Sequence, residues 1–129
     1  MARSGTGRPT DQELEILKVL WDRGPSSVRE VWEVLSQSRE VGTTTVLKLM
    51  QIMRDKGLLL CDVDQRPQVF RPKQTQQAML KHLAGDMLTR VFGGSTKSLL
   101  LHALSSQRCS AGELAEIRQL LDELQEGKK

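Results

Sequence analysis

Residues 43–73 read TTTVLKLMQIMRDKGLLLCDVDQRPQVFRPK, and their hydrophobic period changes halfway along the stretch. Up to Lys56 the apolar residues recur every three or four positions, which predicts a helix that ends at Gly57, a typical C-terminal cap. Residues 58–63 and 68–71 have the composition of two strands and flank the turn sequence Asp-Gln-Arg-Pro. The stretch therefore predicts a helix followed by a β-hairpin.

Two more amphipathic helices are predicted ahead of this stretch. Thr10 and Glu13, and again Ser27 and Glu30, have the spacing of a capping box, which satisfies backbone N–H groups at the start of a helix. Gly24-Pro25 separates the two helices. Three helices followed by a hairpin is the order of a winged helix-turn-helix, whose second motif helix lies in the major groove of DNA. Its core is expected to include Leu17, Trp21, Val31, Trp32, Met50 and Met53.

The predicted third helix has two faces of different chemistry. At 100° per residue, Val46, Leu49, Met50 and Met53 gather on one face, which is expected to pack on the first two helices. The opposite face presents Thr44, Lys48, Gln51 and Asp55, with Thr45 and Ile52 at its edge. Its Thr, Lys and Gln side chains are rich in hydrogen-bond donors and suit contact with base edges, whereas a plain solvent-facing surface usually carries more Glu and Lys and fewer Thr. The residues expected to contact DNA, in the groove or along the backbone, are Thr43, Thr44, Thr45, Lys48, Gln51, Arg66, Arg71 and Lys73.

The charge distribution agrees with a nucleic-acid partner. The 129 residues carry a net charge of +3. Residues 43–73 hold six basic and three acidic side chains, whereas residues 11–40 hold four basic and seven acidic ones. A localised positive patch is what contact with a phosphate backbone requires. On charge alone, an ordinary solvated surface explains the pattern equally well.

Residues 74–129 are predicted to form a separate helical unit. Helices are expected over 75–92, after Ser95 or Thr96, and from a third capping box at Ser110 and Glu113. A lone core in a unit below roughly 70–80 residues rarely supplies adequate stability. We therefore expect a second copy to complete this core, with folding back onto the first domain as the alternative. The expected dimerisation residues are Leu80, Leu83, Met87, Val91, Phe92, Leu114, Ile117 and Leu121.

The composition excludes several classes of protein. Aromatic residues make up 3% of the chain, which disfavours an all-β fold. No apolar run approaches the ~20 residues of a membrane span, and the first ten residues hold no signal-peptide stretch. Cys61 and Cys109 have no metal-ligand spacing and form no disulfide framework, which favours a cytoplasmic location. No nucleophile–base pair or phosphate-binding loop is present, so no enzyme, cofactor or metal site is predicted.

Several stretches resemble the penicillinase-repressor family, the BlaI/MecI-type transcriptional repressors. They lie in residues 10–21, 28–31, 44–58, 71–72 and 91–95. The resemblance implies a homodimer that binds two-fold symmetric operators through winged helices and represses nearby promoters. It also implies inactivation by a membrane-bound sensor peptidase that cuts in the dimerisation region. At the position of the family's Asn-Phe cleavage pair, this sequence has His102-Ala103.

The sequence thus predicts a mainly α protein with a small β-hairpin. A winged helix-turn-helix DNA-binding domain, residues 1–73, is followed by an α-helical dimerisation domain, residues 74–129. The predicted function is a sequence-specific repressor that acts as a homodimer on two-fold symmetric operator DNA, with no membrane insertion. The alternative is a winged helix that binds protein rather than DNA, with its helical tail docking on a partner.

Overall fold

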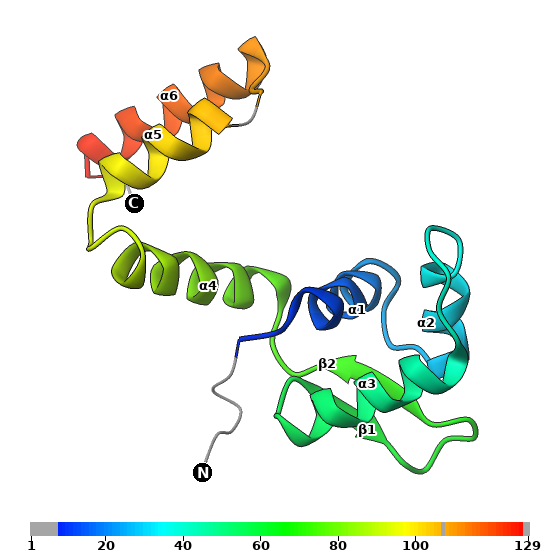
Figure 1. Ribbon diagram of the computed structural model, residues 1–129. Coiled ribbons are helices and arrows are strands. Elements are labelled where there is room, and N and C mark those ends of the chain that lie inside the picture. The colour runs from blue at the N-terminus through cyan, green and yellow to red at the C-terminus, as the bar shows by residue number, and fades with distance from the viewer. Residues whose placement is uncertain (1–7, 107, 128–129) are drawn as a thin grey trace. The chain divides into compact units, whose positions relative to one another are not determined.

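The computed structural model describes residues 8–106 and 108–127, which form six helices and one two-stranded sheet (Figure 1). The chain divides into two compact units, Met1–Leu83 and Ala84–Lys129. The predicted mainly α fold with a small hairpin is confirmed. The elements are α1 (Asp11–Arg23), α2 (Val28–Leu35), α3 (Thr43–Asp55), β1 (Leu59–Asp62), β2 (Val69–Pro72), α4 (Gln76–Arg90), α5 (Thr96–Ser106) and α6 (Ala111–Gln125).

The capping boxes predicted for α1 and α2 are both present. The Glu13 N–H donates to the Thr10 hydroxyl at 3.1 Å, and the Thr10 N–H donates to the Glu13 carboxylate at 3.0 Å. Ser27 and Glu30 form the same reciprocal pair, at 3.2 and 2.8 Å. These bonds satisfy N–H groups that a helix start would otherwise leave without partners, so each helix begins where its sequence predicts.

The buried face of α3 is the one that the helical period predicts. Val46, Met50 and Met53 are fully buried, and Leu49 is partly buried against the same core. The helix ends at Asp55, and Gly57 follows with a φ of 85°, a backbone conformation that L side chains rarely adopt. Because one face of α3 is committed to the core, the opposite face is left for solvent or a ligand.

The two tryptophans lie at the edge of the core and are only partly buried. Each indole N–H donates to a backbone carbonyl, Trp21 to Gln74 at 3.0 Å and Trp32 to Val41 at 2.6 Å. A partly buried indole needs such a partner, because its N–H would otherwise lose its hydrogen bond to water. The tryptophans therefore fix the segments that follow β2 and precede α3.

The hairpin is joined to the loop between α1 and α2. β1 and β2 pair antiparallel, with Leu59 opposite Pro72 and Asp62 opposite Val69. Ser26 adds a short bridge on the other side of β2: its N–H donates to the Phe70 carbonyl at 3.0 Å, and the Phe70 N–H donates back at 2.8 Å. This bridge places the start of α2 beside the second strand of the wing.

The first unit extends beyond the hairpin into α4. Met79 is buried in the winged-helix core, and Leu83 packs partly buried against it. The first unit therefore ends after Leu83, beyond the expected domain boundary at Lys73. Leu83, expected at a dimer interface, contacts the core of its own chain. The outer ends of the two expected domains, residues 1–7 and 128–129, lie outside the described residues.

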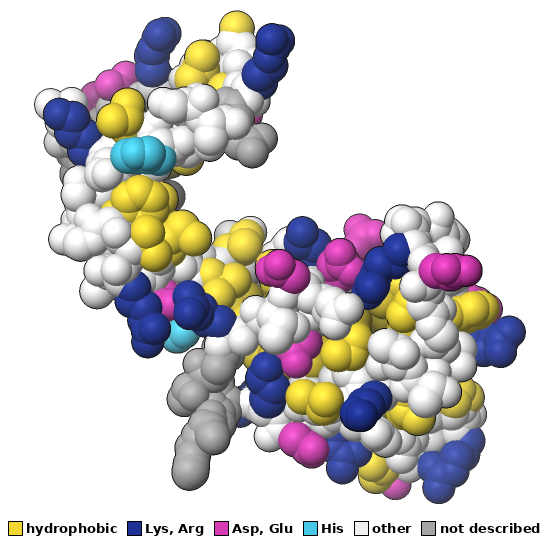
Figure 2. Space-filling model, in the orientation of Figure 1, with side chains coloured by type: hydrophobic (Ala, Val, Ile, Leu, Met, Phe, Trp, Pro, Cys, Tyr) yellow, Lys and Arg dark blue, Asp and Glu magenta, His cyan; other side chains and the backbone are white. Residues whose placement is uncertain are grey.

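The second unit is helical but buries little of its apolar surface. α4 ends at Arg90, two residues before the expected end of this helix, and a turn that contains Gly93-Gly94 follows. The third capping box is incomplete in the described residues: the Glu113 N–H donates to the Ser110 hydroxyl at 3.0 Å, and no reciprocal bond is seen. No described side chain of α5 or α6 is fully buried. Figure 2 shows hydrophobic side chains, in yellow, at the surface of this unit.

One buried carboxylate ties α1 to the end of α3, and removing its partner is expected to destabilise the winged helix. The Glu13 side chain is 4% exposed, and its Oε1 lies 2.7 Å from Lys56 Nζ. Lys56→Ala leaves this carboxylate without its cation, so the free energy of unfolding should fall by about 2–3 kcal/mol. Urea denaturation of the variant and the parent at equal protein concentration measures the difference.

The matched control for this prediction is Lys97→Ala, which removes an exposed lysine from α5. Substitutions at such surface positions usually change stability by no more than about 0.5 kcal/mol. A loss for Lys56→Ala as small as that of the control would show that the ion pair contributes nothing to the fold.

Candidate nucleic-acid interface

The outward face of α3 carries the polar side chains that the sequence predicts for DNA contact. Thr44, Lys48 and Gln51 are exposed at i, i+4 and i+7, so they follow one line along the helix. Thr43 and Thr45 are also exposed, on either side of the start of this line. This face offers hydroxyl, ammonium and amide groups, which are donors suited to base edges in the major groove. The exposed carboxylate of Asp55 ends the line at the last residue of the helix.

The start of α3 is open to an anion. Its N-cap is Gly42, which has no side chain to accept a hydrogen bond from the first turn. The first N–H groups of a helix lack intrahelical partners, and together with the helix dipole they favour a negative group. Thr43 lies at this position and adds a hydroxyl group. The arrangement is compatible with a phosphate at the first turn of α3.

The wing carries three of the residues expected at DNA, and all three are exposed. Arg71 lies on β2 opposite Leu60, and Lys73 follows the strand. The Arg66 guanidinium turns back on its own loop instead of extending outward. Its Nη1 donates to the Val63 carbonyl at 2.6 Å and to the Gln65 carbonyl at 3.1 Å. In this conformation Arg66 closes the turn at the tip of the wing.

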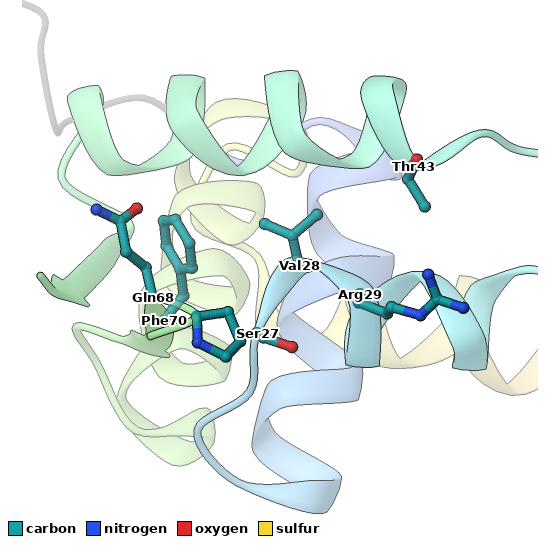
Figure 3. Close-up of a pocket in the computed structure, with 7 residues that line it drawn as sticks. Ser27, Val28, Arg29, Thr43, Gln68 and Phe70 are labelled. Atoms are coloured by element: carbon teal, nitrogen blue, oxygen red, sulfur yellow. The ribbon is translucent and has the colours of Figure 1, made fainter. Parts of the chain in front are cut away.

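A groove of about 350 Å³ lies between the start of α2, the start of α3 and the wing (Figure 3). Val28 and Phe70 point toward α3 and form the apolar floor of the groove. Arg29 extends away from these two side chains along α2. A second groove of about 460 Å³ continues along α2 to the turn of the wing and also includes Arg29. The first groove is lined by Ser27, Val28, Arg29, Thr43, Pro67, Gln68 and Phe70.

Arg29 and Gln68 belong to this groove but were missed among the predicted site residues. The Arg29 side chain is 73% exposed, 3.6 Å from the Glu33 carboxylate, and its guanidinium lies over the Trp32 ring at 5.6 Å from the centroid. The position of Arg29 just after the N-cap of α2 could have indicated an anion site from the sequence, because the start of a helix favours a nearby anion. Gln68 had no such signal, since its place depends on the pairing of the wing with Ser26.

Two carboxylates near the interface are held in their charged form by local hydrogen bonds. The Ser27 N–H bond to the Glu30 carboxylate holds the pKa of Glu30 below its usual value, and Arg23 at 3.5 Å acts in the same direction. At the wing, the Gln65 amide and then the Asp64 N–H lower the pKa of Asp62. Negative charge is therefore fixed at these two places, which disfavours a phosphate directly against them.

The helical unit presents most of the residues expected for dimerisation. Phe92 and Ile117 are partly buried, and Phe92 also contacts the His102 ring, with 5.8 Å between centroids. Leu80 and Leu83 lie instead in the first unit, Met1–Leu83. No helix of the described residues is long and apolar enough to cross a membrane. The exposed members of the expected set are Leu80, Met87, Val91, Leu114 and Leu121.

Comparison with known proteins gives one consistent result. The family model described as "Penicillinase repressor" matches residues 9–123. A penicillinase repressor of Bacillus licheniformis is 27% identical, with 93% of this chain and 94% of that protein aligned. The transcriptional regulator BlaI of Mycobacterium tuberculosis is 32% identical over 91% of this chain and 85% of its own. A penicillinase repressor of Staphylococcus aureus is 19% identical over 87% and 89%.

Proposed function

This chain belongs to the penicillinase repressor family, and from that premise we propose that it represses transcription as a homodimer bound to two-fold symmetric operator DNA. The similar proteins are named as repressors and as a transcriptional regulator. The observation that carries the proposal is the division of α3 into a fully buried apolar face and an exposed face of Thr44, Lys48 and Gln51. The chain is not an enzyme in this proposal; it acts by occupying a promoter.

The proposed docking on DNA follows the usual geometry of a helix-turn-helix. α3 enters the major groove with Thr44, Lys48 and Gln51 toward the bases, which is the docking geometry of a helix-turn-helix. Arg71 and Lys73 then contact the backbone beside the wing. Arg29 and Thr43 at the groove between α2 and α3 hold a neighbouring phosphate. Phosphate contacts fix the register of the protein, and base contacts choose the sequence.

The dimer is supported by the apolar surface that the helical unit leaves uncovered. A second copy that packs against the exposed side chains of Met87, Leu114 and Leu121 removes this surface from water. A symmetric pair of winged helices then matches a symmetric operator. We expect such a repressor to act in the cytoplasm, because the similar proteins are bacterial and bacterial promoter DNA lies there.

Inactivation by a membrane-bound peptidase is the remaining part of the proposal. His102 and Ala103 lie on the exposed second half of α5. A peptidase needs an extended substrate, so this part of α5 must unwind before it is cut. His102 Nδ1 also forms a hydrogen bond to the Ser98 carbonyl at 2.8 Å, one turn earlier in α5. This bond is lost when this part of the helix unwinds.

Selection of random DNA duplexes by the full-length chain tests the proposed function. The expected result is one enriched, two-fold symmetric sequence that gives a dimer-sized complex in a gel shift. If no sequence is enriched and the chain binds all duplexes equally, the protein-binding alternative becomes the better explanation of the winged helix. The duplex selected in this way is the operator of this protein for measurements of individual contacts.

The salt dependence of operator binding tests the backbone contacts. Each phosphate that a lysine neutralises contributes about −0.9 to the slope of log K against log salt concentration. Lys73 occurs twice in the dimer, so Lys73→Ala should flatten the slope by about 2 and weaken all sequences alike. Lys97→Ala, on α5, is the control and should leave the slope unchanged. An unchanged slope for Lys73→Ala would remove Lys73 from the contact list.

A further inference from the structure

The exposed aliphatic side chains of the winged-helix unit gather on α3 and on the wing. Five large hydrophobic residues are exposed in the described part of Met1–Leu83. Leu47 and Ile52 lie on α3, Leu60 and Val63 lie on the wing, and Leu80 lies on α4. Among the described residues, α1 and α2 carry none of them. A single exposed leucine is ordinary, but here most of the set shares the elements that carry the proposed DNA contacts.

Leu47 and Ile52 border the polar face of α3 on its two sides. Leu47 is 40% exposed and, by helical spacing, lies beside Thr44 and Gln51. Ile52 is 39% exposed and lies beside Lys48. Neither residue belongs to the hydrophobic core, which takes Val46, Met50 and Met53 from this helix. The side chains that flank the proposed reading face are therefore apolar and accessible.

We infer that Leu47 and Ile52 contact thymine methyl groups and so make the chain select thymine at positions flanking its polar contacts. This inference rests on the proposed function. In the major groove, the C5-methyl of thymine is the apolar group that a base edge presents. An aliphatic side chain cannot bond a phosphate or a polar base edge, so in a groove it gains free energy by covering that methyl.

The charge of the surrounding surface favours DNA over a protein as the occupant of this face. Residues 43–73, which include Leu47 and Ile52, carry six basic and three acidic side chains. A polyanion complements this segment. Lys48 and Gln51 also lie between the two aliphatic residues along the helix, so a ligand that covers both residues must also meet polar donors. A major groove lined by thymine satisfies both requirements.

Deoxyuridine tests the inference because it lacks only the methyl group of thymine. In the operator, each symmetric pair of thymines is replaced in turn by deoxyuridine, and the affinity of the full-length chain is measured by gel shift. Covering one methyl group corresponds to about a fourfold gain in affinity. Replacing a contacted thymine in both half-sites should therefore weaken binding by roughly sixteenfold, fourfold for each half-site.

The variants identify which side chain covers the methyl. In Leu47→Ala or Ile52→Ala, the sensitive thymine pair should respond to deoxyuridine by less than about twofold, because the contact is already lost. Leu47→Met keeps most of the apolar volume and should keep most of the sensitivity. Val34→Ala, in the groove between α1 and α2, is the control and should behave as the parent.

The outcomes separate this inference from the proposed function. If the operator binds tightly but no thymine responds to deoxyuridine, the inference is overturned and the repressor proposal stands. Sensitivity that survives both alanine substitutions also overturns it, since another group then covers the methyl. If no operator can be selected, the proposed function itself has failed. Retained binding to random duplexes, and unchanged helical circular dichroism, show that each variant is folded.

Discussion

Leu121→Asp is expected to separate the dimer and to lower operator affinity by about 10²–10⁴-fold. Leu121 lies on α6, is 47% exposed and is outside the core of its own chain. A second copy that covers α6 would enclose the new carboxylate in an apolar interface, and an unpaired buried charge is strongly disfavoured. The two winged helices would then bind their half-sites separately, without the gain in affinity that comes from linkage.

Sedimentation and gel shift together decide this prediction. Gln119→Asp is the matched control, because it adds the same charge to the opposite face of α6 and should leave the parent's association state unchanged. Leu121→Asp should sediment as a monomer and keep its winged-helix fold. A parent chain that is already monomeric, or a variant that binds as tightly as the parent, contradicts the dimer model.

Leu83→Asp cannot serve the same purpose. The stripe on the predicted helix over 75–92 makes Leu83 look like Met87, because both occur at helical spacing on one amphipathic segment. In the structure Leu83 packs on the winged-helix core, whereas Met87 is exposed. A charge at Leu83 should therefore destabilise the DNA-binding unit itself, and any loss of operator binding would not report on assembly.

Local signals explain how much of the fold could be predicted from sequence. The capping boxes at Thr10 and Ser27 are complete within four residues, so the starts of α1 and α2 follow from the sequence alone. The spacing of hydrophobic residues in α3 likewise predicts which face is buried and which is exposed, because the rotation per residue in an α-helix is fixed. The expected contact residues of α3 are consequently all exposed, as the prediction requires.

Long-range packing explains what the sequence did not reveal. The first unit continues to Leu83 because Met79 packs in the winged-helix core and the Gln74 carbonyl accepts a hydrogen bond from the Trp21 indole. The spacing of hydrophobic residues in the sequence does not reveal either contact. The groove at Arg29 exists because Ser26 bridges Phe70. Such contacts join residues far apart in the chain, whereas spacing rules describe only neighbours.

The same limit applies to Arg66 at the tip of the wing. Its position in a turn between two strands predicts an exposed arginine, and the residue is exposed. Its direction depends on which carbonyls the turn presents, and here Val63 and Gln65 accept from the guanidinium. For Arg66 to reach a phosphate, these bonds must be exchanged for bonds to DNA. Arg66 should therefore contribute less to the affinity for DNA than Lys73. Among the described contacts, the Lys73 side chain has no hydrogen bond that must first be broken.

Lys48→Ala and Thr44→Ala are expected to remove sequence discrimination from operator binding. Each lost base contact should cost about 1–3 kcal/mol, and the dimer loses each contact twice, so roughly 2–6 kcal/mol of specific binding depends on each residue. Binding to random DNA should depend on the proposed phosphate contacts of the wing, and so it should persist more fully. The measurement is the ratio of operator affinity to random-duplex affinity at one fixed salt concentration.

Lys73→Ala supplies the contrast that makes this ratio interpretable. Lys73 directly follows β2, and its backbone N–H donates to the Leu58 carbonyl at 2.9 Å. Its loss should weaken operator and random duplexes by the same factor and leave the ratio unchanged, because a phosphate contact carries no sequence information. Lys48→Ala should instead collapse the ratio, since an ammonium group at a guanine edge discriminates between bases. If Lys48→Ala and Lys73→Ala behave alike, the exposed face of α3 only positions the protein on DNA, and the sequence must be chosen elsewhere in the winged helix.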